Sequence, residues 1–130
     1  MPVEELRQSP MMAHMLDALD NGEDIGHYGR LTFAMIARYF VGDEELVGLL
    51  TKDEDADEQG IKALVQQVRE KGYNPPRRDR IIEWQEQQDF AICPTPDDPD
   101  SCNVYNELQF PDELYESIQE YREERQTSDS

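Results

Sequence analysis

The longest apolar stretch of the chain lies between Ile25 and Val41, and it predicts a helix that is buried on most of its surface. From Leu31 to Val41 nearly every residue is apolar, apart from Thr32 and one cation, Arg38. A helix with so little polar surface has to be covered by other elements. We therefore expect a helix at about residues 26–41 to form the centre of a small helical domain.

The segments on either side of this helix repeat their apolar residues at helical spacing, and none alternates as a strand would. Serine, aspartate, glycine and proline residues mark where the expected helices begin and end. These helices span about residues 10–20, 43–50, 58–71 and 78–88, with a last one from residue 111. The sequence thus predicts an all-α bundle of five or six helices, one domain over residues 1–125, and a disordered polar tail over 126–130.

Acidic residues outnumber basic ones by 30 to 12, which gives a formal net charge of −18. This excess repels nucleic acid at ordinary salt and weighs against a simple nonspecific DNA-binding protein. Abundant carboxylates with few lysines are also typical of a high-salt cytoplasm, where at about 1 M salt the screening length is roughly 3 Å. Two explanations stay open: adaptation to salt, or an acidic surface that binds a basic partner or imitates nucleic acid.

Two cysteines, Cys93 and Cys102, flank a loop that is rich in proline and acids. They are too few for a disulfide scaffold or for a complete four-thiolate metal site. They could pair, join a metal site completed by another chain, or stay free. The sequence has no run of 18 apolar residues and no cationic leader, so we expect a cytoplasmic protein with no membrane segment, and a reducing cytoplasm favours free thiols.

The predicted central helix carries basic residues that suit an anionic ligand. His27 and Arg38 are far enough apart in sequence to complete three turns, so they point the same way about 16 Å apart, with Arg30 about 60° round from His27. Guanidinium groups, a histidine and the N–H groups at a helix start all donate to phosphate oxygens. The alternative is that the arginines pair with neighbouring acids, because a buried unpaired guanidinium is costly.

Signatures of catalysis are weak. His14 and His27 are the only histidines, and the sequence contains no nucleophile elbow, Walker loop or zinc-protease motif. His14 lies in an apolar helix, where a packed histidine is expected. The one dense basic run, Arg77, Arg78 and Arg80, follows a Tyr-Asn-Pro-Pro linker. We therefore expect a binding protein and not an enzyme.

Several short segments, taken in order, resemble the C-terminal iron–sulfur domain of the large subunit of archaeal and eukaryotic DNA primases. In that family a cysteine opens a helix, a His-x-Gly-Arg stretch begins the next helix with a further base two turns on, and a Tyr-x-Pro segment leads to a second cysteine. Two more cysteines follow around a loop. The matching segments here are SPMMAHMLDAL, HYGRLTFAMIAR, QQVRE, YNPPRRDRII and ICPTPDDPDSC, spread over about residues 9–110.

The resemblance implies functional residues and partners. It places His27, Arg30 and Arg38 where the family contacts the template–primer junction and the 5′-triphosphate of the initiating nucleotide, and it places Arg69 near the same groove. The implied ligands are single-stranded DNA template and a nucleoside triphosphate. The implied partner is a separate primase–polymerase catalytic subunit.

Two of the four cluster cysteines of that family are missing. Met11 or Met12 stands where the first is expected, and Arg77 or Arg78 stands where the second is expected. Two remaining thiolates do not hold a [4Fe–4S] cluster, so we expect the cluster to be lost and no cofactor to be bound. The sequence thus suggests an accessory, non-catalytic domain that assists primer synthesis. The alternative is an acidic helical interaction module or nucleic-acid mimic.

Overall fold

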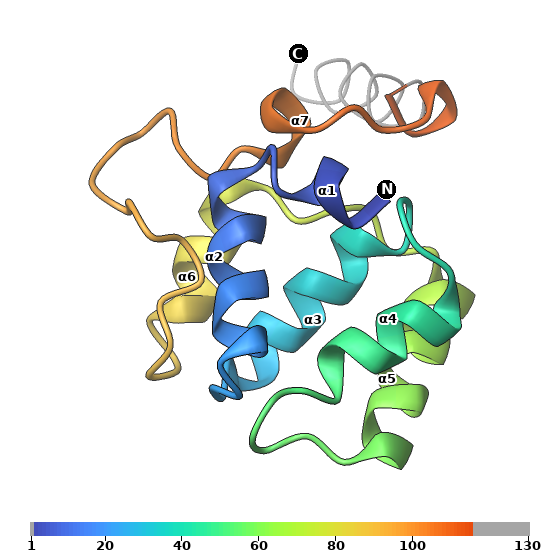
Figure 1. Cartoon of the computed structure of the whole chain (residues 1–130). Helices are drawn as coiled ribbons and strands as arrows, with labels where there is room; N and C mark the ends of the chain where they lie inside the picture. Colours follow the sequence, from blue (N-terminus) through green and yellow to red (C-terminus); the bar gives the residue numbers. More distant parts are fainter. Residues whose placement is uncertain (1, 116–130) are drawn as a thin grey trace.

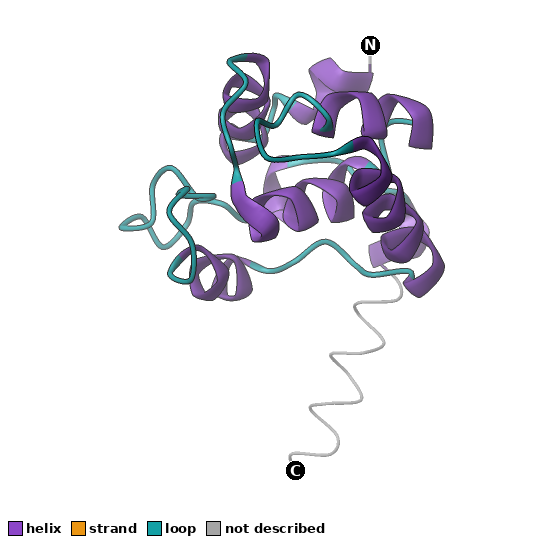
Figure 2. Ribbon diagram, turned by 90° about the horizontal axis from the view of Figure 1, so that it is seen from below, coloured by secondary structure: helices purple, strands orange, loops and turns teal. Residues whose placement is uncertain are grey.

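The computed structural model describes residues 2–115, which form an all-helical fold without strands (Figure 2). Helix α3 (Gly26–Ala37) lies in the middle of the molecule (Figure 1). Its helical neighbours in contact are α2 (Pro10–Asp20), α4 (Asp43–Leu50), α5 (Glu58–Lys71) and α6 (Arg78–Gln85). The prediction of an all-α fold around a central helix is confirmed.

Two further helices were not predicted, α1 (Pro2–Leu6) and α7 (Val104–Glu107). Both are very short, so neither has enough turns to show a helical repeat in the sequence. The expected last helix begins within the described residues, at 112–115, and most of it lies outside them. The tail predicted at residues 126–130 also lies outside the described residues.

The core is built around the buried side of α3. Phe33 and Ile36 are fully buried there, and Met11, Met12 and Met15 of α2 are fully buried as well. Unbranched methionine side chains can fill an irregular space between helices, so these residues act as core packing, as expected. Leu31 and Met35 lie on another side of α3, where they line a pocket.

Helix α3 ends at Ala37, four residues before the predicted end at Val41. The Phe40 N–H donates to the Ala37 carbonyl at 2.9 Å. This bond spans three residues, as in a 3₁₀ turn, and the regular α-helix ends here. Phe40 then packs against Phe110, with ring centroids 5.4 Å apart. The prediction of a longer helix was wrong because the apolar run after Ala37 serves packing against a segment distant in the sequence.

Cys93 and Cys102 form a disulfide, with their Cα atoms 5.8 Å apart. The expectation of free thiols is therefore wrong for this structure. The loop between them turns back on itself, and the Ser101 hydroxyl contacts the Thr95 carbonyl oxygen at 2.6 Å. This turn brings the two cysteines together.

Glu107, the last residue of α7, has a pKa that is raised from its ordinary value of 4.5 by burial. The nearby Ser9 hydroxyl and backbone N–H groups of Asn103 and Cys102 act in the opposite direction with smaller effect. A raised pKa means that the folded protein favours the protonated acid. The resulting stability is fully present below pH 4.5 and is lost as the pH rises through the higher folded-state value.

We expect Glu107→Gln to raise the free energy of unfolding near pH 7 and to change it little near pH 4, because the amide never has to ionise. Chemical denaturation of both proteins at each pH, at the same salt concentration, measures the difference. Glu113→Gln, at an exposed position, is the control. Equal stability of the wild type and Glu107→Gln at neutral pH would contradict the prediction.

Candidate functional site

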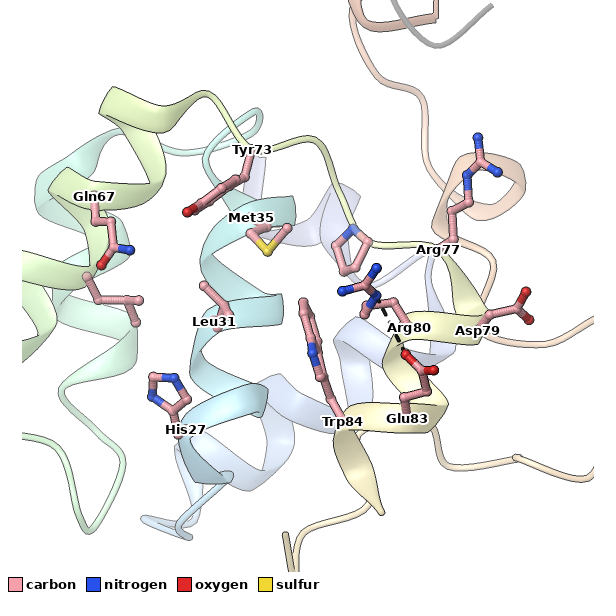
Figure 3. A pocket seen from close by; sticks show the side chains of 12 residues that line it. His27, Leu31, Met35, Gln67, Tyr73, Arg77, Asp79, Arg80, Glu83 and Trp84 are labelled. Carbon is pink, nitrogen blue, oxygen red and sulfur yellow. Dashed lines mark ion pairs between the residues drawn. The ribbon is translucent and has the colours of Figure 1, made fainter. Parts of the chain in front are cut away.

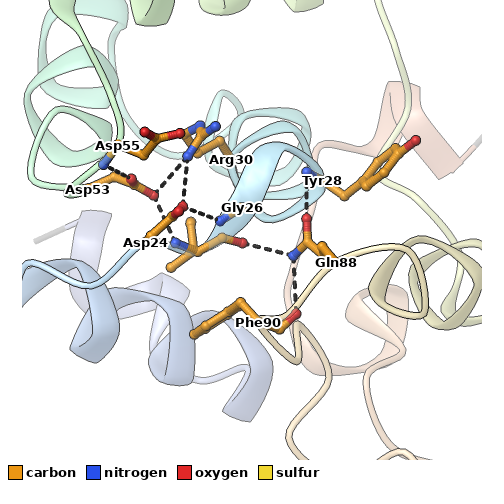
Figure 4. A network of polar contacts seen from close by, with 9 residues as sticks. Asp24, Gly26, Tyr28, Arg30, Asp53, Asp55, Gln88 and Phe90 are labelled. Atoms are coloured by element: carbon orange, nitrogen blue, oxygen red, sulfur yellow. Dashed lines mark hydrogen bonds and ion pairs between the residues drawn. The ribbon is translucent and has the colours of Figure 1, made fainter.

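The start of α3 is occupied by acceptors from the protein itself (Figure 4). The Ile25 N–H donates to Asp53 Oδ2 at 2.9 Å, and the Gly26 N–H donates to Asp24 Oδ1 at 2.8 Å. The Tyr28 N–H donates to Gln88 Oε1 at 3.0 Å. The N–H groups at this helix start, around Gly26 and His27, were candidates for binding phosphate, and the Gly26 N–H and two of its neighbours are instead bonded within the protein.

Arg30 is held in the same network. Its Nη1 atom lies 3.1 Å from Asp24 Oδ1 and 3.1 Å from Asp53 Oδ2. The Arg30 side chain is 14% exposed and that of Asp53 is fully buried. Two carboxylates around one guanidinium leave little positive charge for an external anion, so the structure favours the alternative in which Arg30 pairs with acids.

Arg38 follows the last residue of α3 and takes neither of the two arrangements considered from the sequence. Its Nη2 atom donates to the Tyr39 hydroxyl at 2.6 Å and to the Tyr73 carbonyl at 3.1 Å. Its guanidinium carbon also lies 4.2 Å from the centre of the Tyr39 ring. A hydroxyl, a carbonyl and an aromatic face therefore stabilise this cation in place of an acid or an open anion groove.

The four basic residues singled out in the sequence do not share one groove. His27 and Arg30 line a pocket of about 330 Å³ that also contains Asp55 and Asp57. Arg38 and Arg69 line a separate pocket of about 600 Å³ with Asp43, Glu44 and Glu45, and Arg69 forms an ion pair with Asp43. In the first pocket Arg30 is held by Asp24 and Asp53, and in the second Arg69 is held by Asp43, so these two arginines are already paired with acids. The assignment of His27, Arg30, Arg38 and Arg69 as ligand residues stays a prediction.

A larger pocket, of about 690 Å³, lies between α3, α5, α6 and the linker before α6 (Figure 3). We call it the Trp84 pocket. Its volume is within the range of about 300–1,000 Å³ that is usual for small-molecule sites. It is lined by His27, Leu31, Met35, Leu64, Gln67, Tyr73, Pro76, Arg77, Asp79, Arg80, Glu83 and Trp84.

Aromatic and aliphatic side chains form the walls of the Trp84 pocket. Leu31 and Met35 of α3 lie between Trp84 on one side and Tyr73 on the other (Figure 3). The Trp84 ring stacks on Tyr28, with centroids 5.5 Å apart and planes at 17°, so the indole is fixed in its orientation. Tyr73 is 38% exposed, which is high for a large aromatic residue among residues 2–115. The pocket thus offers flat apolar surfaces to a ligand.

Arg80 supplies positive charge at the mouth of this pocket. Its side chain reaches back toward the pocket, whereas Arg77 points away from it (Figure 3). Arg80 Nε lies 3.7 Å from Glu83 Oε2, and the two side chains are 64% and 70% exposed. An ion pair this long and exposed contributes little, about 0–1 kcal/mol, so Arg80 can exchange Glu83 for a ligand anion. Arg30, by contrast, is largely buried and is held by two acids, one of them the fully buried Asp53.

The sequence contained a signal for this site. Arg80 and Trp84 are four residues apart, which places them on one face of a helix, and both were visible beside the Tyr-Asn-Pro-Pro linker. Helix spacing alone does not say which face of α6 turns toward α3. The packing of Ile81, which is fully buried, decides that orientation.

No family model, curated protein or solved structure matches the chain. The resemblance to the primase domain therefore stays a prediction. None of the helices in residues 2–115 has both the length and the apolar character needed to cross a membrane. Over the same residues, no group of three or more histidine, cysteine, aspartate or glutamate side chains is arranged to hold a metal ion.

Proposed function

We propose that this protein is an accessory nucleotide-binding domain. It holds a nucleoside triphosphate, or the triphosphate end of a nascent primer beside its template, and presents it to a separate primase–polymerase subunit. The observation that carries the proposal is the Trp84 pocket, which combines an oriented indole with an available arginine at its mouth. The resemblance to the primase domain supplies the primase setting, and the pocket supplies the ligand chemistry.

The walls of the pocket suit a nucleobase. One face of Trp84 is already stacked on Tyr28, so a base can stack only on the opposite face, in the pocket that Trp84 lines with Leu31 and Met35. Stacking of a base on an aromatic side chain is worth about 1–3 kcal/mol and requires no particular base. A base in this pocket is therefore held by its flat surface.

The mouth of the pocket suits the phosphates. Arg80 can donate two parallel hydrogen bonds to phosphate oxygens, and His27 lies on the opposite side of the pocket (Figure 3). The net charge of −18 opposes any anion at low salt. At about 1 M salt, charges more than roughly 3 Å away are screened, and the local arginine then dominates.

The proposed mechanism is positioning. A triphosphate held at both its base and its phosphates has lost most of its freedom of movement before it meets the polymerase, which lowers the entropic barrier to the first bond. This role asks no proton transfer or nucleophile of the protein itself. Of the residues predicted from the sequence, His27 is kept in the proposal. Arg80 takes the place of Arg30, Arg38 and Arg69 as the main hydrogen-bond donor to the phosphates.

Arg80→Ala is expected to weaken binding of a fluorescent nucleoside triphosphate about tenfold, because a charge-assisted hydrogen bond is worth about 1.5–3 kcal/mol. Fluorescence anisotropy at about 1 M salt, where screening is strongest, measures the dissociation constant. Arg69→Ala is the matched control, since Arg69 is an exposed arginine of another pocket and should leave binding unchanged. Equal losses in both variants, or a loss only in Arg69→Ala, would refute the assignment to the Trp84 pocket.

Salt and competition distinguish this function from the acidic interaction module. Nucleotide binding in the Trp84 pocket should be competed by unlabelled triphosphate and should persist in part at high salt. Binding of a basic protein to the acidic surface should ignore nucleotide and weaken steadily as salt rises. The second pattern alone would replace the proposed function with the alternative.

A further inference from the structure

The Cys93–Cys102 disulfide closes a loop that is attached to both ends of α6. The backbone N–H of Cys93 donates to Gln85 Oε1 at 2.7 Å, at the last residue of α6. Arg78 Nη2, at the first residue of α6, donates to the Pro96 carbonyl at 2.6 Å inside the loop. Helix α6 carries Trp84 and Arg80, so the loop braces the wall of the Trp84 pocket from behind.

Other contacts to this wall come from α3 and its start, through the stack of Trp84 on Tyr28 and the hydrogen bond from the Tyr28 N–H to Gln88. Helix α6 packs mainly against α3, and Ile81 is its one buried residue. After α6 the chain is tied back by Gln88, which donates to the Ile25 carbonyl at 2.9 Å. The loop itself is exposed over residues 94–100 and is held mostly by its own turns. The disulfide itself is buried, with Cys93 at 0% and Cys102 at 3% exposure, so a reductant reaches it when the exposed loop opens. It is the covalent element that keeps the brace closed.

The backbone of Cys102 is strained in the closed loop. Among the residues that the structure describes, Cys102 is the non-glycine residue with a positive φ, 61°. A side chain in this left-handed region is unfavourable and persists only where the surroundings impose it. When the sulfur–sulfur bond opens, Cys102 is free to leave this conformation, and the loop is then free to release Pro96 and the Cys93 N–H.

We propose that the Cys93–Cys102 disulfide is a redox switch that sets the affinity of the Trp84 pocket. This inference rests on the proposed function and names its regulation. A dithiol reductant breaks the Sγ–Sγ bond by two thiol–disulfide exchanges, the cysteines take up two protons as thiols, and the reductant becomes a cyclic disulfide. The oxidised protein has a braced α6 and binds nucleotide tightly. The reduced protein has a loosened α6 and binds it weakly.

Trp84 reports on this switch directly, because it is the single tryptophan of the chain. Dithiothreitol is expected to shift Trp84 emission to longer wavelength in the absence of nucleotide, as the indole gains contact with water. Affinity for the fluorescent nucleoside triphosphate should fall about fivefold, the effect of losing roughly one hydrogen bond in the bound geometry. Removal of the reductant under air should restore both signals, and titration of thiols follows the state of the disulfide.

Two variants complete the experiment. Cys93→Ser combined with Cys102→Ser should resemble the reduced protein and ignore dithiothreitol. Gln85→Ala keeps the disulfide but removes its link to α6, so the oxidised variant should already show part of the emission shift. This second variant tests the brace even where the double variant does not fold.

The outcomes separate the switch from the nucleotide site. Two free thiols in air-purified protein, or unchanged Trp84 emission after thiol titration confirms reduction, would overturn the switch. Unchanged affinity with shifted emission would show that α6 moves without regulating the pocket, which also overturns it. Absence of nucleotide binding in both redox states would remove the proposed function, while the emission shift would still report whether the disulfide braces α6.

Discussion

Trp84→Ala is expected to weaken nucleoside triphosphate binding at least tenfold, more than any other single change in the pocket. Base–aromatic stacking is worth about 1–3 kcal/mol, and the alanine also removes the surface that excludes water from the bound base. Tyr28 already holds the indole in its orientation, so binding of a base costs little free energy for ordering the Trp84 side chain. Calorimetric titration with nucleoside triphosphate at high salt measures the loss.

The control for this variant is Trp84→Phe, which keeps a flat ring that can stack on Tyr28 and on a base. It should recover most of the affinity. Circular dichroism and thermal unfolding of both variants show whether the bundle stays folded. Full affinity in a folded Trp84→Ala protein would mean that nucleotide does not use this pocket.

Asp53→Ala is expected to lower the free energy of unfolding by about 3 kcal/mol, because it removes the buried partner of Arg30 and leaves the Ile25 N–H without its acceptor. Asp53 is fully buried, pairs with Arg30 at 3.1 Å and accepts the Ile25 N–H at 2.9 Å. It also accepts the Asp55 N–H at 2.8 Å. Its loss therefore affects the start of α3 and the loop before α5 together.

Denaturant unfolding at fixed salt measures this effect, and Glu58→Ala is the control. Glu58 pairs with Lys62 on the surface of α5, where both side chains are more than 60% exposed, so the change should be below about 1 kcal/mol. Arg30→Ala should destabilise the protein in the same way as Asp53→Ala while leaving nucleotide affinity of the folded protein unchanged. A small effect of Asp53→Ala on stability, with a large effect of Arg30→Ala on nucleotide affinity, would restore Arg30 as a ligand residue.

The contrast between Arg30 and Arg80 follows from burial and not from residue type. Both are arginines near acids, and the sequence favoured Arg30 because it lies on the most apolar helix. Arg30 is mostly buried and pairs with two carboxylates, one of them fully buried, whereas Arg80 is exposed and pairs with one exposed carboxylate at 3.7 Å. Arg30 therefore stabilises the start of α3, whereas Arg80 stays available to a ligand anion.

The acidic composition has consequences for both proposals. A net charge of −18 repels nucleotide over long distances, so the Trp84 pocket gains from high salt until the contact with Arg80 is itself weakened. The buried network around Asp53 is less accessible to ions and should respond less to salt. Affinity and stability measured across a salt series should therefore change in different ways.

The sequence by itself determined the all-α class, the central position of the helix after Ile25 and the burial of the methionines in α2. These features depend on the spacing of apolar residues, which is a local property of the chain. The start of α2 was predicted for the same reason, since the Ser9 hydroxyl accepts the Met12 N–H three residues away. Local hydrogen bonds and helical repeats are visible in one sequence.

Only the tertiary structure decided which charges are available and where the ligand site lies. Asp53 reaches Arg30 across 23 residues, and Gln88 reaches Ile25 across 63 residues. An apolar pattern does not encode such distant partners, because any of the 30 acids could have met Arg30. The same holds for Phe110, which ended α3 early, and for the disulfide, which required a turn that folds the loop back on itself. The Trp84 pocket exists because α6 packs across α3 with Ile81 inward, and that packing depends on the whole core.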